Sequence, residues 1–74
     1  MNTMEKLNAM SIVSKYAQTK REYLYNNSLM NDEIKNIIVS YVTDTENLFK
    51  RNFLTLDEAV MRIAMATHYA LNEA

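Results

Sequence analysis

The sequence predicts an all-α fold, a small three-helix bundle, from three observations. The chain has 74 residues and contains no glycine, no proline and no cysteine. Tight β-hairpin turns usually require glycine or proline, whereas helices do not. Apolar residues recur at intervals of three and four over three segments, and residues typical of helix caps flank these segments. We therefore expect one helical domain over residues 1–74, with helices at about 4–25, 31–51 and 56–72.

The first helix, expected over residues 4–25, has a broad apolar face. When the segment is projected at about 100° per residue, one arc contains Ala9, Met10, Ile12, Val13, Tyr16, Ala17, Tyr23 and Leu24. Lys20 falls within this arc. Either its charged end extends past the core to solvent, or the helix bends or ends before it. The polar residues Asn26, Asn27 and Ser28 are expected to form the following turn.

The second helix, expected over residues 31–51, has clear end signals. Asn31 is the expected N-cap, with acidic residues in the first turn, where the helix dipole favours them. Because the chain has no glycine, Asn52 is the residue best suited to a left-handed position after the helix. Phe53 would then pack on Leu48. The expected core face consists of Ile34, Ile37, Ile38, Tyr41, Val42, Thr45, Leu48 and Phe49, with Val39 outside it.

The third helix, expected over residues 56–72, begins with a capping box. The Thr55 hydroxyl can accept from the Glu58 amide while the Glu58 carboxylate accepts from the Thr55 amide. Its expected core face consists of Leu56, Ala59, Val60, Ile63, Ala64, Ala66, Thr67, Ala70 and Leu71. The link to the second helix is short, so we expect these two helices to form an antiparallel hairpin.

Beside this core face runs a second stripe, formed by Met61, Met65, His68 and Tyr69, with Arg62 at its rim. Two interpretations remain open. The stripe is a protein-docking surface, because methionine adapts to irregular partners and tyrosine is enriched at interfaces, or it belongs to a wide core. Met61, Met65 and His68 could also hold a soft metal ion. The chain has no second histidine and no cysteine, so we expect no metal site and no cofactor.

The sequence indicates no catalytic centre. Catalysis requires convergent polar groups in a concave pocket, and the single histidine, His68, has no evident nucleophile beside it. Ser11 and Ser14 lie on a polar face of the first helix. No glycine-rich loop is present to bind phosphate. We therefore expect a protein that is not an enzyme.

Nucleic-acid binding is an alternative function. Lys15, Lys20 and Arg21 alternate with tyrosines near the end of the first helix, and stacking combined with cations is one way to bind single strands. The net charge of the whole chain is only −1. A helix-turn-helix is disfavoured because the third helix, which would read the DNA, carries more acidic than basic residues and phosphates would repel it.

The function expected from the sequence is the binding of another protein by a small regulator or inhibitor. The stripe of Met61, Met65, His68 and Tyr69, with Arg62, would form a helix-face interface. Self-association, as a homodimer, is also expected because small cores are weak. The third alternative is a structural subunit of a larger assembly. The chain shows no signal-peptide pattern and no membrane-length apolar run, so a cytoplasmic location is expected. The asparagine-rich composition suits a gene of a bacteriophage or mobile element.

Overall fold

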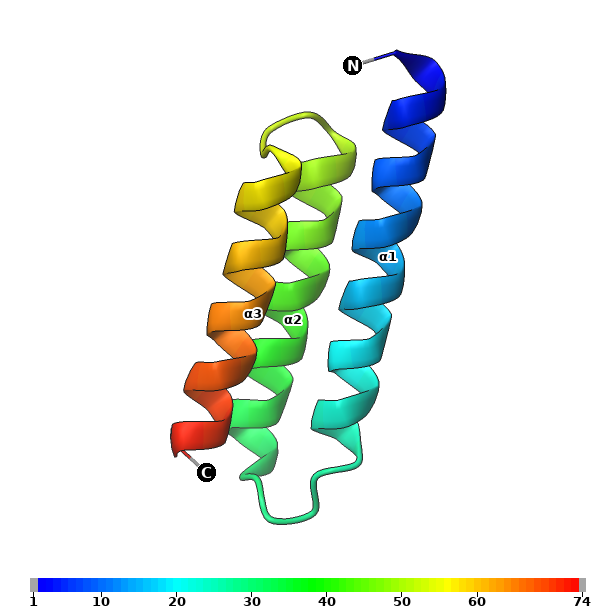
Figure 1. Cartoon of the computed structure of the whole chain (residues 1–74). Coiled ribbons are helices and arrows are strands. Elements are labelled where there is room, and N and C mark those ends of the chain that lie inside the picture. The colour runs from blue at the N-terminus through cyan, green and yellow to red at the C-terminus, as the bar shows by residue number, and fades with distance from the viewer. Residues whose placement is uncertain (1, 74) are drawn as a thin grey trace.

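Three helices make up the computed structural model, which describes the backbone of residues 2–73 and the side chains of residues 2–71 (Figure 1). α1 spans Thr3–Tyr25, α2 spans Asp32–Lys50 and α3 spans Leu56–Glu73, each boundary within one residue of its prediction. Successive helices run in opposite directions, down, up and down in Figure 1, and form a rod of 42 × 18 × 15 Å. The all-α three-helix bundle is thus confirmed. Over the described residues, none of the helices has the length and apolar character needed to cross a bilayer.

The predicted helix caps form as the sequence indicates. The Asn31 side chain accepts hydrogen bonds from the backbone amides of Glu33 and Ile34, at 2.8 and 3.3 Å. At the start of α3, the Glu58 amide donates to the Thr55 hydroxyl at 3.1 Å, and the Thr55 amide donates to the Glu58 carboxylate at 2.9 Å. Local hydrogen bonds therefore determine where α2 and α3 begin.

α2 ends at a left-handed residue, Asn52, with φ of 67°. The Phe53 amide donates to the Leu48 carbonyl at 2.9 Å, and the Asn52 amide donates to the Phe49 carbonyl at 3.0 Å. These two bonds define a Schellman motif, which satisfies carbonyls that the helix end would leave unpaired. The Phe53 ring itself is exposed, with the Arg51 guanidinium 5.4 Å from its centre. The motif turns the chain back so that α3 runs antiparallel to α2.

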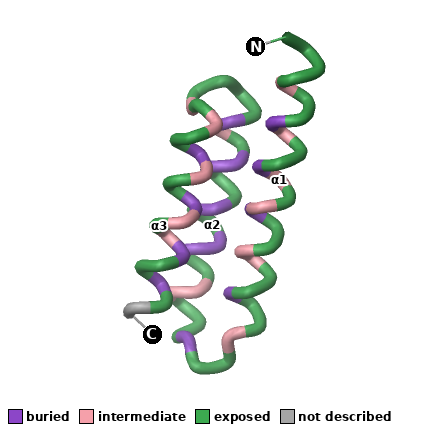
Figure 2. Tube along the Cα trace, viewed as in Figure 1, coloured by how far each residue is buried: buried purple, intermediate pink, exposed green. Residues whose placement is uncertain are grey.

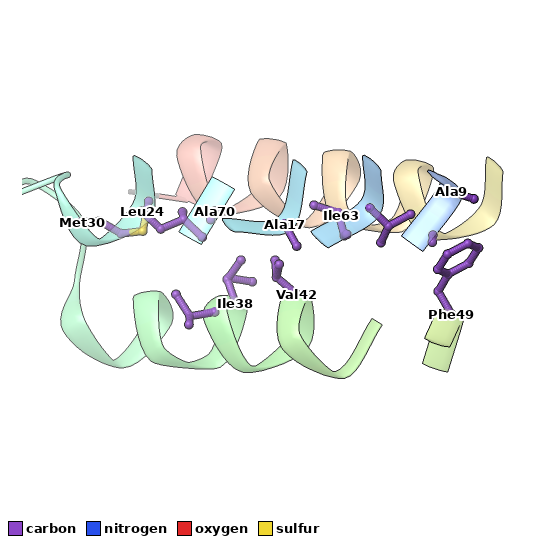
Figure 3. Close-up of a cluster of buried hydrophobic side chains, with 12 residues drawn as sticks. Ala9, Ala17, Leu24, Met30, Ile38, Val42, Phe49, Ile63 and Ala70 are labelled. Carbon is purple, nitrogen blue, oxygen red and sulfur yellow. The ribbon is translucent and has the colours of Figure 1, made fainter. Parts of the chain in front are cut away.

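The core lies along the axis of the bundle, where the three helices face one another (Figure 2). Its buried apolar residues are Ala9, Val13, Ala17, Leu24, Met30, Ile38, Val39, Val42, Phe49, Ala59, Ile63 and Ala70. Phe49 lies at one end of this row and Met30 at the other (Figure 3). A third of these side chains are alanines, which let helix backbones approach closely but bury little apolar area each.

α1 passes Lys20 without a break, so the first of the two alternatives for this residue is confirmed. Lys20 is half-buried, and its Nζ atom lies 5.3 Å from the centre of the Tyr16 ring. The aliphatic stem covers the core while the ammonium group remains near solvent. Two other residues of the expected α1 face, Ile12 and Tyr23, are more than half exposed, so their assignment to the core is wrong.

The buried side of α2 differs from the predicted one. Ile37 and Tyr41, both expected in the core, are 60% and 42% exposed, whereas Val39, expected outside it, is buried. Glu46 is also buried, on the same side of α2 as Val39. Projected at about 100° per residue, the buried face is rotated by about 70° from the centre of the apolar arc. The reason is that α1 packs on the Val39 and Glu46 side of α2, which leaves the opposite edge of the arc uncovered.

A buried carboxylate joins α1 to α2. One oxygen of Glu46 accepts from Arg21 at 2.8 Å, and the other accepts from Ser14 and from Lys50, both at 2.9 Å. Burial alone would raise the pKa of Glu46, but the hydrogen bonds from Lys50, Arg21 and Ser14 outweigh it, and the pKa lies below its usual value. The ionised carboxylate is therefore the form that the folded bundle favours.

The Schellman motif predicts opposite effects of glycine at two asparagines. Asn52→Gly should stabilise the fold by about 0.5 kcal/mol and Asn52→Ala should destabilise it by about 1 kcal/mol, because an alanine Cβ disfavours positive φ. At the exposed, helical Asn47, alanine should instead be more stabilising than glycine by about 1 kcal/mol. Urea unfolding of the four variants measures both differences. If the alanine variant were more stable than the glycine variant at both positions, the result would contradict the left-handed geometry of Asn52.

Glu46→Gln should destabilise the bundle by about 2 kcal/mol at neutral pH, because it leaves Arg21 and Lys50 without their carboxylate. The folded pKa of Glu46 lies below the unfolded one, so its contribution is present above about pH 4.3 and is lost as the pH falls through the folded value. Between neutral and acidic pH, the free energy of unfolding should therefore change less with pH for Glu46→Gln than for the wild type. Glu22→Gln, on an exposed side chain of α1, serves as the control and should follow the wild type.

Candidate docking groove between α2 and α3

The stripe on α3 lies at the surface. Met65 and Tyr69 are 64% and 58% exposed, and Met61, Arg62 and His68 are exposed as well. The core of the single chain therefore does not bury this stripe. α3 buries instead the face centred on Ile63, and this face packs against the other two helices. The stripe makes no contribution to the core that would explain its apolar character.

A shallow groove of about 460 Å³ runs between α2 and α3 on the outside of the bundle. Its lining consists of Ile37, Ile38 and Tyr41 from α2 and of Arg62, Met65, Ala66 and Tyr69 from α3. The exposed apolar edge of α2 therefore continues directly into the exposed stripe of α3. Two helices together present a surface that neither helix presents alone.

The structure divides the residues that the sequence proposed for this site. Arg62, Met65 and Tyr69 line the groove. Met61 and His68 do not line it. Around the α3 axis they project about 40° and 60° beyond Met65, on the side away from α2. Arg62, expected at the rim, is part of the groove wall. On α3 the site therefore includes fewer residues than the predicted stripe. It also includes residues of α2, which the stripe did not.

Ile37 and Tyr41, which the apolar periodicity of α2 assigns to the core, belong to the candidate site instead. The width of the apolar arc on α2, about 140° when projected, was the available signal. Two neighbouring helices in a three-helix bundle cover less than this arc, so one edge must remain exposed. Which edge it is depends on the position of α1, and the periodicity of α2 contains no information about that position.

The groove is suited to bind apolar groups and one anionic group. Its walls are aliphatic, aromatic and thioether side chains, and Arg62 supplies its cation. Arg62 contributes to the lowered pKa of Glu58, and no ion pair within 4.0 Å joins it to a carboxylate among the described side chains. In the described part of the chain, no three histidine, aspartate or glutamate side chains gather where they could bind a metal ion. The groove therefore offers apolar contacts and one cation.

Of the three cations proposed for nucleic-acid binding, Lys15 and Lys20 line one hollow on α1, whereas Arg21 is held elsewhere. Arg21 is held by Glu46, Lys20 lies over the Tyr16 ring, and the exposed Lys15 lines the same hollow as Tyr16 and Lys20. Their directions around the helix differ by about 100° or more. Of the two serines, Ser14 donates to Glu46 and Ser11 is exposed. Part of the positive charge of the first helix is therefore neutralised inside the bundle.

A larger hollow, of about 600 Å³, lies at the end of the bundle near the start of α1. Its cation, Lys6, has its Nζ atom 4.4 Å from the centre of the Phe49 ring and 3.4 Å from the Phe49 carbonyl oxygen. Lys6 thus helps to close the end of the core. The groove between α2 and α3 differs because its cation, Arg62, makes no ion pair within 4.0 Å with a carboxylate among the described side chains.

No family model, curated protein or solved structure matches this chain. The candidate site therefore rests on the geometry of the groove.

Met65→Glu should change the free energy of unfolding by less than about 0.5 kcal/mol, because the side chain is 64% exposed. Ile63→Glu, two residues away and fully buried, should abolish folding because it places a charge in the core. Circular dichroism and urea unfolding of the two variants test this contrast. A large loss of stability in Met65→Glu would show that Met65 is a core residue and would exclude it from a docking surface.

Proposed function

We propose that this protein is a non-enzymatic regulator or inhibitor that binds another protein through the groove between α2 and α3. The observation that carries the proposal is the joint exposure of four large apolar side chains, Ile37, Tyr41, Met65 and Tyr69, along one groove. Contiguous exposed apolar surface in a small protein is typical of an interaction site. Aromatic residues, methionine and arginine are the residue types that interface centres favour.

The expected partner element is an amphipathic helix. From Arg62 to Tyr69 the groove extends over about 10 Å of α3, which matches two turns of a helix laid along it. Such a helix would place apolar residues at spacings of three and four over Tyr41 and Met65. An acidic residue one or two turns away would pair with the Arg62 guanidinium. Binding of this kind would regulate the partner by covering its helix, without any chemical step.

The competing functions have less geometric support. Of Lys15, Lys20 and Arg21, Arg21 is engaged by Glu46, so only Lys15 and Lys20 would be available to contact a nucleic-acid backbone. A structural subunit would require a surface for open-ended assembly, whereas the exposed apolar groove lies on one side of the rod. We place the binding activity in the cytoplasm, in agreement with the absence of cysteine from the chain.

Affinity capture from host lysate with three baits tests the proposal. The wild type and Leu29→Glu should retain the same partner, and Met65→Glu should lose it, with affinity reduced about 100-fold or more in a titration of the purified partner. Leu29 is a matched control because it is 90% exposed and lies in the loop between α1 and α2. Partners that bind all three baits equally, or a shifted nucleic-acid band at low salt that Lys20→Glu abolishes, would contradict this function.

A further inference from the structure

The groove has a positive charge in its α3 wall, and a negative charge lies beside its α2 wall, in an adjoining hollow that shares Ile37 and Tyr41 with the groove. Arg62 lies in its α3 wall. Asp44 is exposed on α2 in the same row as Ile37 and Tyr41, with the spacing of three and four that places residues along one side of a helix. A surface that presents an apolar centre and both members of an ion pair can be complementary to itself.

The two helices are matched level by level along the groove. α2 ends at Lys50 and α3 begins at Leu56, and both rise about 1.5 Å per residue in opposite directions. Measured from these ends, Asp44 and Arg62 lie at about 9 Å, Tyr41 and Met65 at about 14 Å, and Ile37 and Tyr69 at about 20 Å. Each level therefore has one residue on α2 and one on α3, with Asp44 bordering the groove and the other five residues lining it.

We propose that, without a partner, the groove is covered by the same groove of a second copy of this chain, related by a two-fold axis parallel to the helices. This inference rests on the proposed function, since it concerns the same surface. The rotation places α2 of one copy opposite α3 of the other, so residues meet at their own level. Tyr41 then contacts Met65 of the second copy, a favourable aromatic and sulfur contact. Asp44 pairs with Arg62 of the second copy, and the symmetry repeats both contacts.

The charges select this axis over the alternative. A two-fold axis perpendicular to the helices would reverse the levels, so that Asp44 would face Ile37 of the second copy and Arg62 would face Tyr69. The carboxylate would then be desolvated without a cation, which is unfavourable. The parallel axis leaves no charge unpaired. It also makes every neighbouring pair of helices antiparallel, as in an up-down four-helix arrangement.

The area of the groove indicates a reversible dimer. The four apolar side chains, each about half exposed, offer on the order of 400 Å², whereas a stable interface buries about 800 Å² per partner. Asn36, Ser40 and Met61, which flank the groove, must supply the rest. Interfaces at the lower end of the size range are typical of weak or transient association, so we expect the dimer to be reversible. The dimer thus competes with the proposed partner, and partner binding converts it into a complex with a single copy.

Charge reversal on the full-length protein tests the inference. Arg62→Asp and Asp44→Arg, each alone, place like charges opposite one another and should weaken dimerisation by about tenfold or more. An equimolar mixture of the two variants should recover wild-type affinity, because every contact in the mixed dimer again joins opposite charges. Sedimentation equilibrium across the micromolar range measures both effects. Lys15→Asp, a reversal on the exposed part of α1, should dimerise as the wild type does.

The outcomes separate this inference from the proposed function. A wild-type chain that stays monomeric, or forms species larger than a dimer, overturns the dimer. Two variants that dissociate singly but fail to associate when mixed overturn the parallel axis. If the wild type is monomeric yet loses its captured partner on Met65→Glu, the proposed function stands and the second copy does not. If the mixture dimerises and no captured protein depends on Met65, the dimer stands and the proposed function does not.

Discussion

The carboxylate of Glu46 is the interaction on which the arrangement of the bundle depends. Its two oxygens bind Arg21 and Ser14 from α1 and Lys50 from its own helix. A buried carboxylate is tolerated only when it is paired and hydrogen-bonded, so α1 must lie on the Glu46 side of α2. The polar network thereby sets the rotation of α2 about its own axis. The side of α2 that carries Ile37 and Tyr41 is left without a neighbour.

That exposed edge links the folding of the bundle to its proposed function. A core in which alanine is frequent gains modest stability from burial, and burying Ile37, Tyr41, Met65 and Tyr69 would add to it. The three helices cannot do so, because each helix has only two neighbours. The groove is therefore apolar surface that the single chain exposes at a cost in solvation. A second protein surface, whether a partner or another copy, would remove this cost.

Part of the candidate site could be predicted from the sequence. On α3, neither the capping box nor the buried face around Ile63 accounts for the stripe that contains Arg62, Met65 and Tyr69. The periodicity of α3 is regular enough to separate this stripe from the buried face. Ile37 and Tyr41 could not be assigned in the same way, because the apolar arc of α2 is wider than its buried face. Met61 and His68 were included because they lie on the same stripe, yet α2 approaches only one of its edges.

The sequence by itself determined the number of helices, their ends and the turns between them, since caps such as Asn31, the capping box of Thr55 and Glu58, and the left-handed Asn52 act through hydrogen bonds within a few residues. Only the tertiary structure decided which part of each apolar arc is buried. That choice depends on which helices approach from which sides and on where Glu46 finds its cations. These contacts join residues far apart in the chain, so the periodicity of one helix cannot specify them.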